Sequence, residues 1–146
     1  MKPMDSAFAI ICWKNKILLF LRDNIPTIPN PNCWQLPGDR VEKGETPLQA
    51  LKRELVEEIS YSPKTITFLG EVNRPDGHTH IYFSFVKNAE AVKFRHVGDE
   101  GQKIGFFTLN QMEKIRLAPK LKSRLLNQRK FMVKALKRES FEGLRL

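Results

Sequence analysis

The sequence predicts an α/β (α+β) fold in which a mixed β-sheet is sandwiched between helices. Three observations lead to this class: apolar runs rich in β-branched and aromatic residues recur up to residue 108, an amphipathic helical segment interrupts them at 47–59, and a basic amphipathic segment follows at 119–137. The 146 residues are 41% hydrophobic and 28% charged, which is ordinary for a globular chain. We therefore expect residues 1–146 to form one domain, with a core at about 6–115 and a basic helical segment at about 116–146.

The expected strands are apolar runs bounded by turn residues. Residues 6–13 and 16–22 form the first pair, because Lys14-Asn15 between them suits a hairpin turn. Residues 23–32 contain three prolines and should form a loop near the mouth of a cleft. Further strands are expected at 34–36, 65–73, 80–87, 92–94 and 103–108, with a short helix at 109–115 and a break in the last helix near Asn127.

The segment 47–59 carries a full set of helix signals. Thr46 is a good N-cap, Pro47 suits the first helical position, and Gln49 completes a capping box with Thr46. At about 100° per residue, apolar side chains spaced three and four apart share one face of a helix. The apolar stripe consists of Leu48, Leu51, Leu55 and Ile59. This face should pack against the core.

Three carboxylates on the same helix form the strongest candidate site. Glu54, Glu57 and Glu58 stand at i, i+3 and i+4, so they share one side of the helix, next to the apolar stripe and at the edge of a cleft. Mg²⁺ prefers oxygen ligands and commonly bridges carboxylates to substrate phosphates, so the arrangement indicates metal-assisted phosphoryl transfer. Arg53 stands four residues before Glu57, where its charge would orient the carboxylates. The alternative is a solvated, glutamate-rich helix face.

The stretch from Gly38 to Tyr61 resembles the Nudix box, whose pattern is Gly-x5-Glu-x7-Arg-Glu-U-x-Glu-Glu-x-Gly-U, with U a bulky apolar residue. The positions in register are Glu45, Arg53, Glu54, Leu55, Glu57 and Glu58. Asp39 and Ser60 replace the two glycines, and a positive φ at the first of these positions would carry some cost for aspartate. The similarity covers about residues 6–115 and is closest to the MutT-like nucleotide pyrophosphohydrolases. Outside the box it rests on residues 17–22, 36–38, 75–78, 81–86, 100–102 and 106–107.

This resemblance implies hydrolysis, dependent on Mg²⁺ or Mn²⁺, of a pyrophosphate bond in a nucleoside triphosphate or another nucleoside diphosphate derivative. It also implies an α/β/α sandwich with a loop-helix-loop metal site. The implied metal ligands are Gly38 through its carbonyl, Glu54, Glu57, Glu58 and Glu100, with Asp99 as the alternative to Glu100. The implied catalytic residues are Glu45, Arg53, Glu54, Glu57 and Glu100, with Glu54 as a ligand or the general base. The implied substrate contacts are Arg22, Asp76 and Gly38.

Each of these roles has a structural alternative. Arg22 at a strand end suits a phosphate clamp or a surface salt bridge. Glu100 lies in a glycine-flanked loop and is otherwise a solvated acid, and Gly38 is otherwise a turn glycine. The asparagine with which MutT-like enzymes read oxidised guanine has no clear counterpart in residues 116–119, so oxidised dGTP is not strongly favoured.

The net charge of +9 is uneven, because nearly the whole excess lies in residues 116–146. We expect the apolar face of this segment to pack on the core and its lysines to remain in water. The alternative functions are a nucleic-acid-associated protein and a catalytically silent Nudix-like binding module, with the basic C-terminal helix as the nucleic-acid contact. A small nucleotide is therefore the favoured partner, ahead of nucleic acid.

The cellular setting follows from what the sequence contains. Cys12 and Cys33 lack metal-site spacing, and the apolar setting of Cys12 suits a buried thiol in a reducing compartment. The chain has no apolar run of about 18 residues and no signal-peptide pattern, so we expect a cytoplasmic location without a membrane partner. The base, sugar, leaving group, number of metal ions and oligomeric state stay open.

Overall fold

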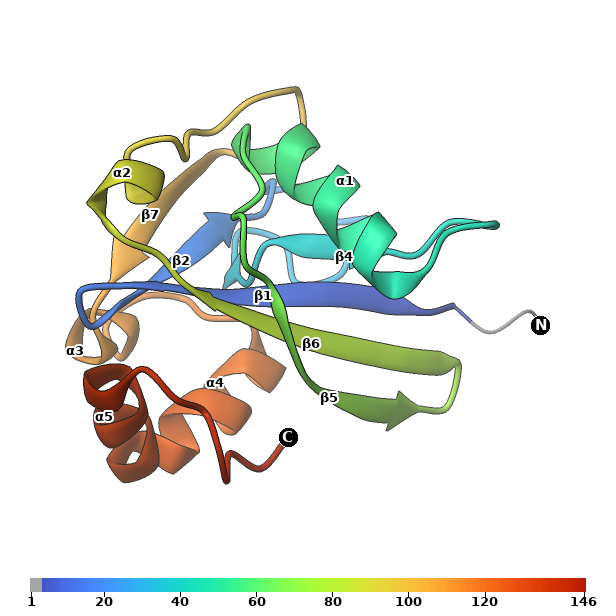
Figure 1. Ribbon diagram of the computed structural model, residues 1–146. Coiled ribbons are helices and arrows are strands. Elements are labelled where there is room, and N and C mark those ends of the chain that lie inside the picture. Colours follow the sequence, from blue (N-terminus) through green and yellow to red (C-terminus); the bar gives the residue numbers. More distant parts are fainter. Residues whose placement is uncertain (1–3) are drawn as a thin grey trace.

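A mixed sheet organises the chain, of which the computed structural model describes residues 4–146 (Figure 1). The strands are β1 (Ser6–Trp13), β2 (Lys16–Leu21), β3 (Trp34–Gln35), β4 (Gly38–Arg40), β5 (Thr67–Arg74), β6 (Gly77–Phe85) and β7 (Lys103–Phe107). The main path runs β3-β2-β1-β6-β5, with β4 paired to β1 and β7 paired to β2. β1 and β6 are parallel, and the other pairs are antiparallel. The predicted mixed sheet is therefore confirmed.

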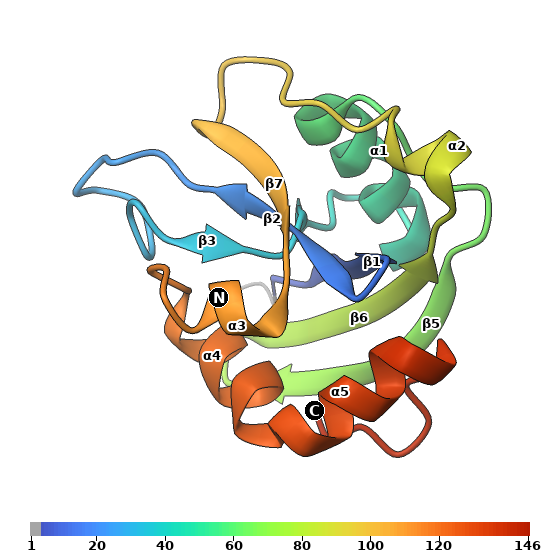
Figure 2. The ribbon, with the colours of Figure 1, turned by 90° about the vertical axis from the view of Figure 1, so that its left-hand side faces the viewer.

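Helices cover both faces of this sheet. α1 (Pro47–Ile59) lies on one face, and Figure 2 shows α3 (Leu109–Met112), α4 (Pro119–Leu125) and α5 (Arg129–Arg138) on the other. Alternate side chains of β1 enter two apolar clusters, one shared with α1 and one with the C-terminal helices. β1 reads as a continuous apolar run because both of its faces are buried.

The predicted capping box of α1 is present. The Thr46 hydroxyl accepts a hydrogen bond from the Gln49 N–H at 3.2 Å, and the Gln49 side chain accepts one from the Thr46 N–H at 2.9 Å. Leu51, Leu55 and Ile59 are 0% exposed, whereas Leu48 is only partly buried. The stripe thus fixes α1 against the sheet, and the neighbouring side of the helix meets β4.

Two expectations about local structure were wrong. The segment before the 47–59 helix, expected as the first loop of the loop-helix-loop, contains the strand β4, because residues 38–40 pair with β1 in an antiparallel register that the local sequence does not predict. Residues 92–94 were read as a strand, but the chain forms the short helix α2 (Asn88–Ala91) before them and no strand there. Val92 is 80% exposed, while Phe94 packs beside the α1 cluster, so the apolar residues at 92–94 serve no sheet pairing.

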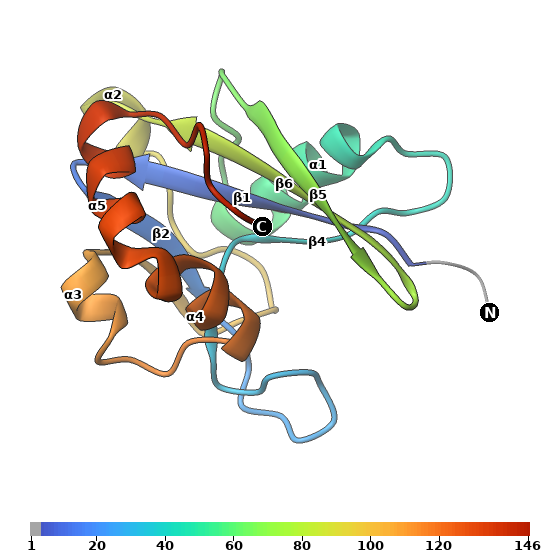
Figure 3. The same cartoon turned by 90° about the horizontal axis from the view of Figure 1, so that it is seen from below.

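The basic C-terminal segment packs on the sheet as expected. Figure 3 shows α4 and α5 crossing the face opposite α1, separated by a 3-10 turn (Leu126–Gln128) at the predicted break. Their buried side chains Leu121, Leu125, Met132 and Leu136 join one cluster with Phe141, which is 1% exposed. Lys130, Lys134 and Lys137 are exposed. In residues 4–146, no helix is long and apolar enough to cross a membrane.

Candidate active site

Gly38 occupies a position that accepts no side chain. Its φ is +126°, and a Cβ atom built there would lie 2.1 Å from the carbonyl oxygen of Ala7 on β1. This close approach turns the Gly38 N–H toward α1, where it donates a hydrogen bond of 2.9 Å to Oε1 of Glu58. The interpretation of Gly38 as a plain turn residue is therefore wrong, because it joins β1, β4 and α1.

Glu58 is a buried carboxylate without a charged partner. The residue is 5% exposed, and in the described part of the chain its side chain accepts a hydrogen bond from the Gly38 N–H and forms no salt bridge. Burial raises the pKa of Glu58 to about 9, and the nearby charges of Glu54, Asp39 and Glu100 act in the same direction, against the Gly38 hydrogen bond. The group therefore takes up either a proton or a cation.

Arg53 holds the other acidic side chains of the helix in place. Its guanidinium binds Glu45 through two contacts, Nε to Oε2 at 2.8 Å and Nη2 to Oε1 at 3.0 Å. Nη1 also donates to Glu54 Oε1 at 2.8 Å and to Glu57 Oε2 at 3.3 Å. These bonds lower the pKa of Glu45 and raise that of Arg53 above its ordinary value. The expected orienting contacts of Arg53 are thus present in the structure.

Glu54 and Glu57 differ in their surroundings. The Glu54 side chain is 12% exposed, and burial raises the pKa of Glu54 although Arg53 opposes this change. The Glu57 side chain is 58% exposed. Helix α1 therefore presents one buried, one partly buried and one exposed carboxylate on the side that meets β4 and its flanking loops.

The loop that carries Glu100 packs against the end of α1. The Val97 N–H donates to the carbonyl oxygen of Glu58 at 3.2 Å, and the Glu100 charge contributes to the raised pKa of Glu58. The negative charge of Glu100 therefore belongs to the electrostatic environment of Glu58. Within residues 4–146, no three Asp, Glu, His or Cys side chains converge closely enough to hold a metal ion in this conformation. The oxygen-rich donor set nonetheless suits a hard divalent cation.

The two residues that replace box glycines fit by different means. Asp39 lies in β4 opposite Ala7 and is not among the described residues with positive φ, so the expected conformational cost does not arise. Ser60 does take the left-handed conformation, with φ of +67°, and caps α1 through its N–H to Val56 O. Its hydroxyl also donates to Lys93 O at 2.9 Å, which helps to hold a conformation that glycine would adopt without strain.

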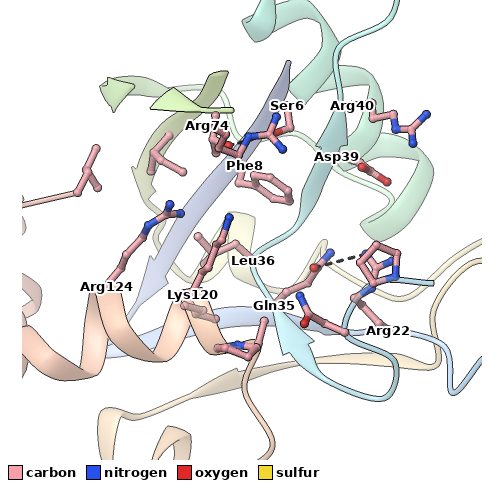
Figure 4. Close-up of a pocket in the computed structure, with 18 of the residues that line it drawn as sticks. Ser6, Phe8, Arg22, Gln35, Leu36, Asp39, Arg40, Arg74, Lys120 and Arg124 are labelled. Atoms are coloured by element: carbon pink, nitrogen blue, oxygen red, sulfur yellow. Dashed lines mark hydrogen bonds between the residues drawn. The ribbon is translucent and has the colours of Figure 1, made fainter. Parts of the chain in front are cut away.

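A cavity of about 790 Å³ opens beside β4 (Figure 4). Its size lies within the range of roughly 300–1,000 Å³ that is usual for small-molecule sites. Phe8, Leu36 and Ile81 contribute apolar surface, and Asp39 lies at the side nearest α1. The proline-rich loop contributes Pro29 and Asn30, among other lining residues, so the expected place of this loop near the cleft is confirmed.

Of the expected substrate contacts Arg22, Asp76 and Gly38, the first two line the cavity and Gly38 is not among its lining residues. Nη1 of Arg22 donates to Gln35 Oε1 at 3.5 Å, and its buried Nε lacks a hydrogen-bond partner in the described residues. No carboxylate of residues 4–146 lies within 4.0 Å of this guanidinium, so the surface salt-bridge alternative is wrong. Asp76 lies 3.6 Å from Nη1 of Arg74, at the tip of the β5–β6 hairpin.

Sequence reasoning missed four cations in the cavity wall, Arg40, Arg74, Lys120 and Arg124. The chain from Arg116 to Ala118 pairs with Trp34 of β3 through bonds of 2.7 and 2.9 Å, and this contact brings the start of α4 to the cavity. Lys120 and Arg124 are spaced i, i+4, so they share a face of α4, beside the buried Leu121 and Leu125. The sequence shows the i, i+4 spacing of Lys120 and Arg124, but it does not predict that this face of α4 borders the cavity.

Comparisons with known proteins agree with this arrangement. A family model for the NUDIX domain matches residues 2–128. The chain is 36% identical over 117 residues to the ADP-ribose pyrophosphatase of Methanocaldococcus jannaschii, and the aligned residues cover 77% of this chain and 66% of that protein. It is 30% identical over 112 residues to the 8-oxo-dGTP diphosphatase of Escherichia coli, and the aligned residues cover 75% of this chain and 86% of that protein. The crystal structure of a MutT NUDIX hydrolase from Burkholderia pseudomallei matches with a TM-score of 0.64 and 27% identity, over 76% of this chain and 87% of that one. The chain therefore belongs to the NUDIX hydrolase family.

Proposed function

We propose that this chain hydrolyses a pyrophosphate bond in a small nucleotide derivative with Mg²⁺ or Mn²⁺ as cofactor. The observation that carries the proposal is Glu58, a carboxylate that is 5% exposed and that has no cationic partner in the described residues. Burying an ionised carboxylate is costly unless a cation accompanies it. Glu54 and Asp39 add negative charge beside Glu58, and Asp39 also lines the cavity that several arginines border.

The proposed metal ligands are Glu54, Glu57, Glu58, Glu100 and the carbonyl oxygen of Gly38. When bound, the metal would neutralise charge on the diphosphate and lower the pKa of the attacking water. Glu58 supplies an oxygen that is held by the Gly38 N–H, and Glu57 supplies an exposed one. The Glu57 and Glu100 side chains are exposed, so they are free to turn toward such a site.

The other acidic and basic groups have distinct proposed tasks. Arg53 donates to Oε1 of Glu54, whereas Oε2 has no hydrogen-bond partner among residues 4–146, which suits Glu54 to accept a proton from water at that atom. Arg53 and Glu45 act as positioning residues through their paired contacts. Arg22, with its weak bond to Gln35, would bind a substrate phosphate, and Asp76 a polar group of the nucleoside.

The names of the relatives narrow the first substrates to test. ADP-ribose and 8-oxo-dGTP are named for the relatives from Methanocaldococcus jannaschii and Escherichia coli. Ala118 and Pro119 line the cavity without a side-chain amide, but Asn30 and Gln35 also line it and each carries one. We therefore test ADP-ribose, unmodified nucleoside triphosphates and oxidised dGTP side by side.

The test is a panel of ADP-ribose, ATP, dGTP and 8-oxo-dGTP, followed by chromatography of the products in Mg²⁺, in Mn²⁺ and in EDTA. We expect turnover that requires the metal and falls on the order of 10³-fold or more in Glu57→Gln and Glu58→Gln. Glu142→Gln is the matched control, because Glu142 is exposed and lies outside the cavity lining. Full turnover in EDTA, or near-normal rates in both variants, would contradict the proposal.

We extend the proposal to the organisation of the chain and its compartment. Residues 116–146 belong to the same domain as the catalytic part, since Leu121 and Phe141 enter one apolar cluster with β1. Cys12 and Cys33 are both free and buried, which supports a reducing compartment such as the cytoplasm.

A further inference from the structure

A group of basic side chains gathers in the wall of the cavity that lies away from Asp39 (Figure 4). Arg74 comes from the end of β5, and Lys120 and Arg124 come from α4. Figure 4 shows Lys120 and Arg124 extending from α4 into the space that Arg74 borders, with Phe8 and Leu36 between this group and the side of Arg22. We call Arg74, Lys120 and Arg124 the distal basic cluster.

The distal basic cluster has little negative charge to balance it. Arg124 is partly buried, and neither it nor Lys120 has a carboxylate within 4.0 Å in the described part of the chain. Burial lowers the pKa of Arg124, and the charge of Arg74 acts in the same direction. Like charges held together in a partly desolvated site repel each other, so a bound anion would stabilise all of them.

Arg74 is also incompletely satisfied. Its Nη1 lies 3.6 Å from Asp76 Oδ1, and its Nη2 donates to the carbonyl oxygen of Met4. The buried Nε of Arg74 has no partner within residues 4–146. A buried N–H without an acceptor carries a penalty, so a modest shift of this guanidinium toward an anion is favourable. Asp5, the other acid near this wall, is already engaged with His78 and His80.

These features match a phosphate monoester better than a carboxylate. A phosphate monoester carries about −1.5 to −2 charge at neutral pH and three acceptor oxygens, which suits two guanidinium groups and one ammonium group. The apolar surface of Phe8 and Leu36 lies between the two charged ends and suits a nucleoside. The anion at the distal end would thus belong to the nucleoside side of the same substrate.

We infer that the distal basic cluster binds a second phosphate, attached to the nucleoside of the substrate, apart from the diphosphate that is cleaved. This inference rests on the proposed pyrophosphohydrolase function. The preferred substrates are therefore nucleoside diphosphate derivatives with an additional phosphate on the 2′- or 3′-hydroxyl of the ribose.

The experiment compares matched substrates that differ by that one phosphate. The pairs are ADP-ribose with its 2′-phosphate, and dephospho-coenzyme A with coenzyme A, which bears a 3′-phosphate. We expect kcat/KM to be about 10- to 100-fold higher for the phosphorylated member of at least one pair, as charge-assisted bonds to a phosphate provide. Arg124→Gln should reduce this ratio to near one, and Lys120→Gln should reduce it in part.

Lys122→Gln is the matched control, because Lys122 is exposed on the same helix and lies outside the cavity lining. It removes the same charge, so a general electrostatic effect would lower the ratio equally in Lys122→Gln and in Arg124→Gln. Such an equal loss would overturn the inference. Circular dichroism of each variant checks that the helices are retained, and Lys120→Gln supplies a second reading if Arg124→Gln folds poorly.

The outcomes separate the two proposals. Equal hydrolysis within both pairs would overturn the distal phosphate site and leave the pyrophosphohydrolase function standing. If neither pair is hydrolysed, calorimetric binding of AMP and of adenosine 2′,5′- and 3′,5′-bisphosphate tests the site alone. Equal affinities for the three would overturn it, and tighter binding of a bisphosphate that is lost in Arg124→Gln would support it. Preference for 5′-triphosphorylated RNA over every small pair would assign the cluster to a polymer and overturn the inference.

Discussion

Replacing Glu58 by glutamine should stabilise the metal-free protein at alkaline pH while it removes activity. The pKa of Glu58 is about 9 in the folded chain against an ordinary value of 4.5, because the carboxylate is buried. The folded state therefore binds a proton more tightly than the unfolded state in this range. Stability from this group is fully present below pH 4.5 and is lost as the pH rises through about 9.

The magnitude follows from one proton. A full difference of one bound proton changes the free energy of unfolding by about 1.4 kcal/mol per pH unit. Between pH 6 and pH 8 the wild-type chain should therefore lose about 2–3 kcal/mol from this group. Glutamine has no charge to titrate, and its side-chain oxygen still accepts a hydrogen bond from the Gly38 N–H.

The assay is urea unfolding at several pH values between 6 and 8 in the presence of EDTA. The difference in unfolding free energy between Glu58→Gln and the wild type should grow with pH in favour of the variant, whereas Glu142→Gln should follow the wild type. Added Mg²⁺ should stabilise the wild type and not Glu58→Gln, since a ligand stabilises only the state that binds it. Parallel pH dependences of Glu58→Gln and the wild type would refute the argument that a lone buried carboxylate dominates here.

Three further substitutions test the scaffold of the site. Arg53→Lys keeps the positive charge but loses the paired contacts to the acidic side chains. We therefore expect kcat to fall on the order of 10²-fold while the free energy of unfolding changes little. Unchanged steady-state kinetics would count against the positioning role of Arg53. Gly38→Ala should lower the free energy of unfolding, measured in urea, by about 3 kcal/mol or more, because its Cβ would lie 2.1 Å from the carbonyl oxygen of Ala7. The Cβ of Gly44→Ala would meet open space, so this variant should lose only about 1 kcal/mol. Equal losses in the two variants would refute the steric argument. Phe141→Ala should cost about 3–5 kcal/mol because Phe141 is 1% exposed, and a loss below about 1 kcal/mol would show that the C-terminal segment is not part of the core.

The helix that carries the acidic side chains could be predicted because its determinants are local. Thr46, Gln49 and the spacing of the apolar stripe lie within one short segment, and the structure reproduces the capping box that they imply. The contacts of Arg53 follow from the same helical geometry, together with Glu45 just before the helix. The chain order of these residues was therefore enough to place them.

The remaining parts depend on contacts between segments far apart in the sequence. Gly38 meets Ala7 across a strand pair, and Arg74 and Arg124 reach one cavity from segments about 50 residues apart. Local patterns carry no information on which strand will accept a neighbour or which face of a basic helix will border a cavity. The same reason accounts for the missed strand β4 and for the strand wrongly expected at 92–94.

The proposed metal site and the distal basic cluster come from different layers of the fold. The acidic side chains of the metal site come mainly from α1, whereas α4 meets the sheet on the opposite face through apolar side chains. Substitutions on the polar face of α4 can therefore accumulate without disturbing the geometry around Glu58. In evolutionary terms, the chemistry of the site is inherited with one layer of the fold, while the choice of substrate is free to diverge in the other.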